Sequence, residues 1–326
     1  MRPPPALALL VLAPFIGEVL SLSTPLSAFP LPQYLLFEAA LYGGGALVIR
    51  EVVRRRALGL RGMLLLGAAY GVLEEALVVR SWFAPEYFTD PAASAYSRVW
   101  GTNVLMASHL TLFHAVVSVW CSITVVELLF PRRRATAWAG RRGLGAAGLG
   151  MLVVLGLSLG SGAFFAVPVP QFLAAAGLMT VLGALAIRSP GGRGRARAPR
   201  SAWRLAGVTG LAVTAHFLTV WTLPSAPVPW PAGLVLALVP PAAALAWGHG
   251  RVHTDHERWA VVAGLAGPFI LLQAVVGTAR PDALATAILA TAGLILLRRR
   301  VRGGGARIAR GQPSGTMSPK SPSPRR

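Results

Sequence analysis

Residues 62–79 read GMLLLGAAYGVLEEALVV, an apolar run that carries two adjacent carboxylates, Glu74 and Glu75. An apolar helix of about this length can cross the ~30 Å hydrocarbon core of a bilayer. A charged group at bilayer depth costs between ~2.5 and ~17 kcal/mol depending on the reference state, so such acids usually face a partner, a cavity or a cation. The run therefore predicts a membrane-spanning helix, and its glutamate pair is the first candidate for a functional site.

The composition of the whole chain supports a membrane protein. Hydrophobic residues make up 54% of the 326 residues and charged residues only 13%, and the mean hydropathy is +0.60. These values are too apolar for a soluble domain of this length. The single cysteine, Cys121, excludes an intrachain disulfide framework and a CxxC metal knuckle. The abundance of Arg, Ala, Gly and Pro is typical of a bacterial protein encoded by GC-rich DNA.

Apolar runs divide the chain into ten predicted spans, which together form an all-α polytopic bundle. Six of them lie in an N-terminal part, residues 1–187, and four in a C-terminal part, residues 205–297; a basic Gly/Arg/Pro-rich loop, residues 188–204, separates the parts, and a basic tail, residues 298–326, is predicted to be disordered. The first run has an alternative interpretation as a cleaved signal peptide, which Pro14 and Glu18 disfavour. The ten spans are residues 6–22, 33–53, 62–79, 100–130, 144–167, 171–187, 205–223, 232–247, 259–278 and 283–297.

The basic residues that give the chain its net charge of +20 fall mainly on one side of the predicted spans. Of the 31 Lys and Arg residues, all but Arg80, Arg98 and Arg280 fall on one side of the ten spans. The positive-inside rule makes that side cytoplasmic, with both termini on it, and predicts a bacterial inner (plasma) membrane location. We expect the arginine clusters to attract anionic lipid headgroups. Nucleic acid is not an expected partner, because the basic residues form short clusters between apolar runs instead of one basic face.

Acidic and imidazole side chains recur within the predicted spans at similar depth. With a rise of 1.5 Å per residue, the Glu74–Glu75 pair lies roughly 8 to 9 Å below the outer boundary. Glu38 and His109 fall at a comparable depth, Glu18 lies in the outer half of the first span, and the remaining histidines lie nearer the midplane. These groups predict a hydrophilic cavity that opens outward. The candidate site residues are Glu18, Glu38, Glu74, Glu75, His109, His114 and His216.

Carboxylate and imidazole together form the ligand set of Zn²⁺ and similar metals. A catalytic site of this kind uses three protein ligands and a further carboxylate that activates water. Neighbouring glutamates lie about 100° apart on a helix, so one can ligate or orient while the other acts as general base. Zinc is accordingly the cofactor that this donor set would suit.

Two of the motifs resemble those of the CPBP or CAAX-type intramembrane metalloproteases. Glu74-Glu75 precedes Arg80, and Leu105-x-x-x-His109 follows on the next span, over about residues 60–130. The resemblance implies that Glu74 or Glu75 is the general base and that His109, with His114 or His216, binds the metal. The family's third motif, His-x-x-x-Asn/Asp, is not found at the expected distance, and His216 is the only later histidine within a predicted span.

Three functions remain open on the sequence alone. The first is a bacterial membrane protein of unassigned function whose six N-terminal helices enclose a polar site at Glu74-Glu75. The second is an intramembrane metal-dependent protease. The third is a proton- or cation-coupled small-molecule carrier, in which Pro240-Pro241 would mark a broken helix, although no internal repeat supports it.

Each candidate also has a purely structural interpretation. Glu74 and Glu75 could be protonated acids that bond across helices. His114 shares a helical face with Ser118 and Cys121, which is typical of a polar packing stripe, and His216 could be a satisfied core histidine. The loop 248–257 resembles a metal site in composition, but its spacing fits no known finger, and a solvated loop is favoured.

Overall fold

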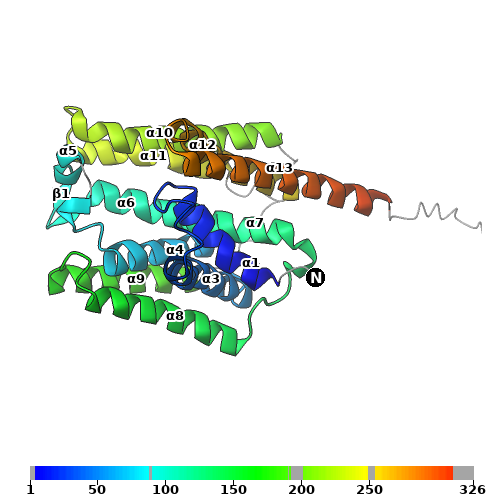
Figure 1. Ribbon diagram of the computed structural model, residues 1–326, viewed down its shortest axis with the longest axis horizontal. Helices are drawn as coiled ribbons and strands as arrows, with labels where there is room; N and C mark the ends of the chain where they lie inside the picture. The colour runs from blue at the N-terminus through cyan, green and yellow to red at the C-terminus, as the bar shows by residue number, and fades with distance from the viewer. Residues whose placement is uncertain (1–3, 88–89, 190, 192–200, 249–253, 311–326) are drawn as a thin grey trace, which may run out of the picture.

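The computed structural model describes residues 4–87, 90–189, 191, 201–248 and 254–310, and these form a bundle of helices with one short β-hairpin (Figure 1). The N-terminal helices are α1 (Pro5–Pro14), η1 (Phe15–Val19), α2 (Pro32–Glu38), η2 (Ala39–Gly43), α3 (Gly44–Arg55), α4 (Leu60–Val72) and η3 (Leu73–Val78). The middle of the chain forms η4 (Pro85–Tyr87), α5 (Pro91–Ala95), β1 (Arg98–Val99), β2 (Thr102–Asn103), α6 (Val104–Phe113), η5 (His114–Cys121), α7 (Ser122–Leu129) and η6 (Pro131–Arg133). The remaining elements are α8 (Arg141–Gly160), α9 (Val169–Ile187), α10 (Ala202–Thr222), η7 (Leu223–Ser225), α11 (Trp230–Gly248), α12 (Asp255–Val276) and α13 (Pro281–Arg310).

Seven helices among the described residues are long and apolar enough to cross a membrane. They are residues 104–129, 141–160, 169–187, 202–225, 230–248, 255–276 and 281–303. The other three predicted spans coincide with the helical runs 5–19, 32–55 and 60–78. The first of these runs is apolar but short, and the other two carry buried charged residues within them, including Glu38, Arg50 and Glu74.

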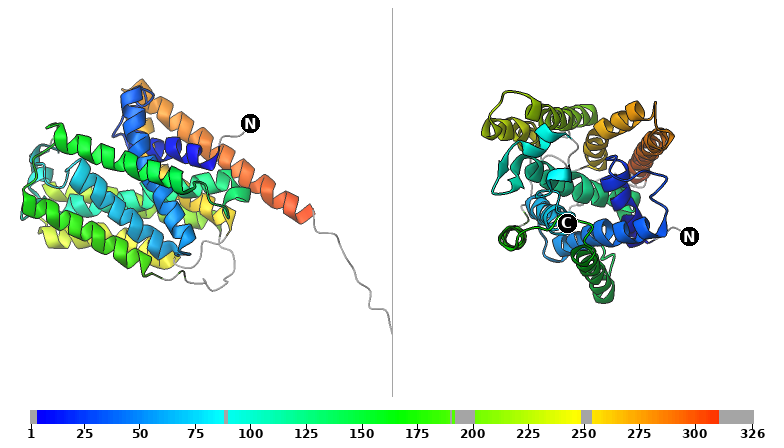
Figure 2. Two further views of the ribbon diagram at one scale, coloured as in Figure 1. Left: turned by 90° about the horizontal axis from the view of Figure 1, so that it is seen from below. Right: turned by 60° about the vertical axis from the view of Figure 1, so that its left-hand side comes forward.

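The burial pattern is that of a bundle surrounded by lipid. Large aliphatic side chains on the outer helices are exposed, among them Leu152 on α8 and Leu211 on α10. The run α6–η5–α7 lies in the middle, with α8 and α9 on one side and α10 to α13 on the other (Figure 2). Apolar surface that faces acyl chains has no cost in a bilayer, so the protein buries its polar groups and exposes its leucines.

The two predicted parts of the chain pack against each other through three shared clusters of buried residues. Val117 and Cys121 on η5 contact Val262 and Phe269 on α12 in a cluster that also includes Ile16 of η1. The N-terminal and C-terminal parts are therefore joined along the central helices.

Three sequence-based boundaries differ from the structure. The fourth span begins at Val104, not at residue 100, because residues 98–103 form the hairpin β1–β2, whose turn residues Trp100 and Gly101 both have positive φ. The α11 helix continues through Pro240 and Pro241, where an interruption was expected; membrane helices tolerate proline when neighbouring groups satisfy the freed carbonyls. The α13 helix runs on to Arg310, past the predicted end at residue 297, so the first part of the tail that was predicted to be disordered is helical; residues 311–326 lie outside the described residues.

The basic loops gather at one end of the bundle. Arg54 donates to the carbonyls of Arg134, at 3.1 Å, and Ala135. Arg134 in turn lies 2.8 Å from Asp255, and Arg258 lies 2.7 Å from Glu127. Segments distant in sequence thus bring their arginines together, as the charge asymmetry predicts.

Candidate functional site

Four helices change from α to π geometry where they approach one another. The π-helical turns among the described residues are η1, η2, η3 and η5. Glu18 lies in η1, Tyr42 in η2, and the pair Glu74 and Glu75 in η3, while His114 begins η5. A π turn bonds i to i+5, so it rotates the following side chains relative to an α-helix, and such turns concentrate at functional sites. The candidate site is built on these turns.

The centre of the site is a triad of Glu74, Glu75 and His114. His114 Nε2 lies 2.8 Å from Glu75 Oε1, and His114 Nδ1 lies 3.1 Å from Glu74 Oε2. All three side chains are buried, with exposed fractions of 2% for Glu74 and 1% for His114. The imidazole is therefore held between two carboxylates, with one nitrogen facing each.

Two serines fix the orientation of this triad. Ser81, just beyond the end of η3, donates its hydroxyl to Glu75 Oε2 and is fully buried. Ser118 lies one turn along η5 and places its Oγ 3.1 Å from His114 Nδ1. Hydrogen bonds of this kind to ligating or catalytic groups set their orientation and their basicity.

A second layer of polar side chains surrounds the triad. The Tyr42 hydroxyl donates to Glu18 Oε1, and Thr24 donates to Glu18 Oε2 at 2.9 Å. The rings of Tyr42 and Tyr70 lie 5.8 Å and 5.9 Å from the His114 ring, centroid to centroid. Glu38 is buried at the end of α2 and interacts electrostatically with Glu18 and Glu74. Two carboxyl groups thus contact the imidazole, and two more, from the other two helical runs, lie around them.

Three polar atoms in this region are buried without a hydrogen-bond partner: Glu38 Oε2, Glu74 Oε2 and the Tyr70 hydroxyl. Glu74 Oε2 is within ion-pair distance of His114 but is not in line with an N–H of the ring. Buried polar atoms in native proteins nearly always have a partner, which is often water or an ion. The donor atoms of the site are therefore arranged for an additional group.

The triad could hold a metal ion. One ligand atom from each of Glu74, Glu75 and His114 lies within 4.8 Å of the others. Carboxylate oxygens and imidazole nitrogens are both donors that Zn²⁺ accepts, and a catalytic zinc site uses three protein ligands and keeps a fourth position open. The residues present fit such an ion in donor chemistry and in spacing.

His109 and His216, which the sequence predicted as metal ligands, lie outside this triad. His109 Nδ1 is 2.9 Å from His216 Nε2, and His216 Nδ1 is 2.7 Å from the carbonyl of Ala237. The two imidazoles therefore bond to each other and to the α11 backbone. Among the described residues, the group with metal-ligand spacing contains neither of them. The two histidines differ because their side chains point in different directions around the helix axis. His109 is on regular α6, five residues before the π turn that directs His114 toward the acids.

Other predicted residues are distributed as follows. Glu74 and Glu75 contact the His114 imidazole. Glu18 bonds to Tyr42 beside it, and Glu38 interacts electrostatically with Glu18. Arg80, part of the family resemblance, points away from the triad and donates to the carbonyls of Ser158 and Phe165, which ties η3 to the end of α8. Of the predicted solvated loop 248–257, residues 249–253 lie outside the described residues. Its last three residues are not loop but the first turn of α12, which Thr254 caps through a capping box with Glu257.

Sequence reasoning missed the two tyrosines, whose rings pack against the His114 ring. The sequence feature that could have indicated them is the glycines on the neighbouring helical segments. A Cβ on Gly17 would lie 2.5 Å from the Tyr42 ring, and one on Gly45 would overlap the Tyr70 ring. Glycines in apolar spans indicate close approach of a neighbour, but the sequence does not reveal that the neighbour is aromatic.

The fold and site together define a polytopic helical membrane protein with a buried acid–imidazole centre. The chain belongs to an uncharacterised membrane protein family, whose family model matches residues 7–290. No match was found among curated proteins or among solved structures. The matched range includes every residue of the candidate site.

Proposed function

We propose that this protein is a membrane-embedded, metal-dependent hydrolase. Glu74, Glu75 and His114 would hold one divalent ion, with zinc the favoured metal. The single observation that carries the proposal is the convergence of these three donors, fully buried, within 4.8 Å of one another. The sequence resemblance to CPBP-type proteases supports the same class of reaction.

The charge of the site supports a bound cation. Three buried carboxyl groups and the half-buried Glu18 lie near a single imidazole, and isolated ionised carboxylates in a low-dielectric interior are prohibitively costly. The cost is removed either by protons or by a metal ion. A divalent ion would also give Glu74 Oε2 the partner that it lacks.

The residues around the triad would supply the remaining chemistry. A bound metal of this type lowers the pKa of a coordinated water and polarises a substrate carbonyl. Ser81 and Ser118 would hold Glu75 and His114 in orientation. Glu18, reached from the triad through Tyr42, would accept the proton of the attacking water. This assigns the base to Glu18, whereas the resemblance implies Glu74 or Glu75.

Metal content tests the ligand set. The full-length protein is purified in mild detergent with zinc supplied, and metal per chain is measured by mass spectrometry. We expect one ion per chain in the wild type, loss of the ion in His114→Ala and Glu75→Gln, and retention in the matched control His109→Ala. Absence of metal from the wild type, or retention in His114→Ala, would overturn the proposal.

Hydrolysis is tested separately. Proteoliposomes containing the protein are incubated with a library of membrane-anchored peptides, and cleavage is followed by mass spectrometry. We expect cleavage that a zinc chelator abolishes, and we expect Glu18→Gln to retain the metal but to lose cleavage. Cleavage that persists in both the chelated wild type and Glu75→Gln would contradict a metal-dependent mechanism.

A proton- or cation-coupled carrier is the second candidate function. The observation that favours it is the presence of Glu18 and Glu38, two acids beyond the three-ligand set. The uninterrupted α11 removes one of its sequence arguments, because Pro240 and Pro241 do not break the helix. Proton uptake into proteoliposomes driven by a substrate gradient, with no metal in the protein, would favour the carrier.

The topology also belongs to this proposal. We infer ten spans, with both termini at the basic end of the bundle, and the positive-inside rule makes that end cytoplasmic in a bacterial inner membrane. The ten helical runs and the gathering of Arg54, Arg134 and Arg258 at one end support this assignment. Anionic headgroups would lie against this end.

A further inference from the structure

Arg298 on α13 is stacked against two tryptophans at the basic end of the bundle. Its guanidinium carbon lies 4.8 Å from the centre of the Trp203 ring and 5.1 Å from that of the Trp259 ring. Trp203 is at the start of α10, and Trp259 lies one turn into α12. Three helices of the C-terminal part of the chain therefore meet at this arginine.

The position of the guanidinium is fixed by packing. The indole N–H of Trp259 donates to the carbonyl of Leu294 at 3.0 Å, and the Trp259 side chain is buried. Leu297, directly before Arg298, belongs to the same buried cluster as Trp259. A guanidinium over an aromatic face is attracted by the electrons of the ring. The arginine is thus held in place before any ligand binds.

This stacking leaves the hydrogen-bonding groups of Arg298 unused. The rings meet the face of the guanidinium, whereas its several N–H donors lie at the edge. Within the part of the chain that the structure describes, no hydrogen bond or ion pair joins Arg298 to another residue. Its donors are therefore available to an acceptor that these residues do not supply.

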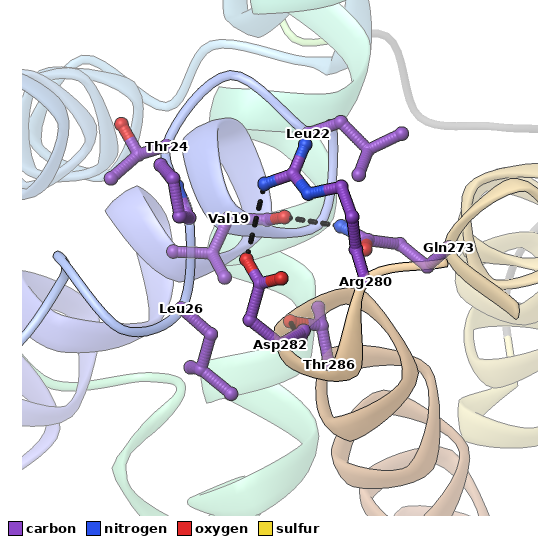
Figure 3. A pocket seen from close by; sticks show the side chains of 9 residues that line it. Val19, Leu22, Thr24, Leu26, Gln273, Arg280, Asp282 and Thr286 are labelled. Carbon is purple, nitrogen blue, oxygen red and sulfur yellow. Dashed lines mark hydrogen bonds and ion pairs between the residues drawn. The ribbon is translucent and has the colours of Figure 1, made fainter. Parts of the chain in front are cut away.

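Other arginines of the chain do have polar partners. Arg280, just before the opposite end of α13, forms an ion pair with Asp282 at 3.2 Å (Figure 3). Arg258 at the basic end pairs with Glu127 at 2.7 Å. Arg54 on α3 donates to backbone carbonyls. The lack of a partner is a feature of the place where α10 and α13 meet.

The charges next to Arg298 are also positive. Arg302 lies one turn further along α13 and so shares its helical face, and Arg204 follows Trp203 on α10. Both of these arginines are exposed. Among the described residues, neither forms an ion pair with an acid. The charge complement of this surface is an anion from outside the chain.

We propose that this surface binds the headgroup phosphate of an anionic phospholipid, in the leaflet at the basic end of the bundle. Its members, which we call the α10–α13 corner, are Trp203, Arg204, Trp259, Arg298 and Arg302. The edge of the Arg298 guanidinium donates in parallel to two phosphate oxygens, the geometry in which arginine binds phosphate most strongly. The site requires neither the metal nor the reaction proposed above.

The position of the corner favours a lipid as the source of the phosphate. The side chains of Ile295 and Leu296 are exposed on the turn of α13 before Arg298, so the guanidinium lies where the lipid-facing apolar surface ends. Trp203 is 65% exposed at the same level, and tryptophan is typical of the membrane interface. Acyl chains of the bound lipid would lie against the exposed aliphatic side chains of α13.

Native mass spectrometry of the full-length protein in mild detergent tests the site. The protein is titrated with phosphatidylglycerol and, in separate arms, with phosphatidylcholine of the same acyl chains and with glycerol phosphate. We expect one phosphatidylglycerol per chain to bind about fivefold or more tightly than phosphatidylcholine, and glycerol phosphate not to bind at the same concentrations. Glycerol phosphate that bound as tightly as phosphatidylglycerol would overturn the assignment to a lipid.

Two substitutions distinguish a stacked site from a diffuse attraction between charges. Arg298→Gln should weaken phosphatidylglycerol binding about fivefold or more, the contribution of one basic residue at an anionic surface. Trp203→Leu leaves the net charge unchanged but removes one ring, and we expect binding about two- to fivefold weaker, the range for an exposed cation–π contact. Because Trp203 is largely exposed, its replacement leaves the core intact.

The matched control is Arg142→Gln, which removes the same charge from an exposed arginine at the start of α8. The α8 helix lies on the other side of the central run from α10 and α13 (Figure 2), so screening should limit the effect on binding to less than about twofold. Equal losses in Arg298→Gln and Arg142→Gln would overturn the site, as would wild-type binding in Trp203→Leu.

Arg298→Lys provides a variant that keeps the charge of the corner. Lysine lacks the planar guanidinium that stacks and donates in parallel, so weaker binding in this variant supports the site and unchanged binding contradicts it. Metal content enters none of these measurements. The lipid site and the hydrolase can therefore fail independently of each other.

Discussion

The chain buries two acid sites that differ in how their charges are matched. At the basic end, Glu51 accepts hydrogen bonds from Arg50 and from the backbone N–H of Trp138, the latter at 2.9 Å, and Arg55 lies 3.4 Å away. Arg50 also lies 3.9 Å over the Trp138 ring. Each ion there has a counter-ion and several bonds, which is the arrangement of a structural ion pair.

At the Glu74–Glu75–His114 site, by contrast, the acids are not matched by an equal number of partners. Its acids outnumber its single imidazole, and one of its carboxylate oxygens, Glu74 Oε2, is buried without a hydrogen-bond partner. Its helices adopt π geometry, whereas Glu51 lies on regular α3. A fully matched buried ion pair stabilises one conformation, while an unmatched set is available to bind a cation. The comparison teaches that burial of an acid alone does not identify its role; the partners do.

The largest expected loss of stability comes from breaking the Arg50–Glu51 ion pair, the matched site. Glu51→Ala leaves Arg50 buried without its counter-ion, and breaking such a pair costs about 3–5 kcal/mol. We expect a correspondingly lower midpoint in denaturant titration of the detergent-solubilised protein. Replacing both residues together, as Arg50→Met with Glu51→Leu, should recover much of that loss. A single variant as stable as the wild type would show that the pair is not structural.

The next effect concerns the space around the unmatched site. Gly17→Ala would place a Cβ 2.5 Å from the Tyr42 ring and 3.0 Å from Ser118 Oγ. Overpacking of this kind costs about 1–3 kcal/mol, and displacement of Tyr42 should also weaken metal binding. The control is Gly148→Ala on α8, whose Cβ would meet nothing within 4 Å. Thermal unfolding and metal titration of the two variants measure the difference; equal values would contradict the tight fit.

A smaller effect is expected where a matched pair is partly exposed. Arg258 lies 2.7 Å from Glu127, with exposed fractions of 29% and 12%. Solvent-accessible pairs contribute about 0.2–1 kcal/mol, so Arg258→Gln should lower stability by no more than this. Since the pair is screened by ions, the difference from the wild type should shrink as salt is raised. A loss as large as that of Glu51→Ala would remove the distinction between buried and exposed pairs.

The smallest stability effect is expected at the triad itself. Glu75→Gln keeps an acceptor oxygen for His114 and removes one negative charge from a site with too many, so we expect unfolding within about 0.5 kcal/mol of the wild type or slightly higher stability. Metal content should nevertheless be lost. Glu51→Gln is the matched comparison, because the same substitution there removes the charge that Arg50 needs. If Glu75→Gln were the more destabilising of the two, the triad would be structural.

The sequence by itself determined the class of the protein and much of its site. Apolar runs of membrane length predict the helices, since in lipid every backbone group must be bonded within its own segment. The depth of Glu18, Glu38, Glu74 and Glu75 in those runs predicts that they share one layer. In the structure these acids interact with one another electrostatically, and Glu74 and Glu75 contact one imidazole.

Only the tertiary structure decided which histidine joins those acids and what connects them. His109 and His114 occupy the same helical run, yet one bonds to His216 and the other to Glu75. The choice depends on the rotation of each helix about its axis, and a π turn between α6 and α7 sets that rotation. Such a turn forms because of packing against neighbouring helices, which is a property of the assembled bundle and not of the local sequence. The same packing brings the Tyr42 hydroxyl to Glu18 and its ring to His114.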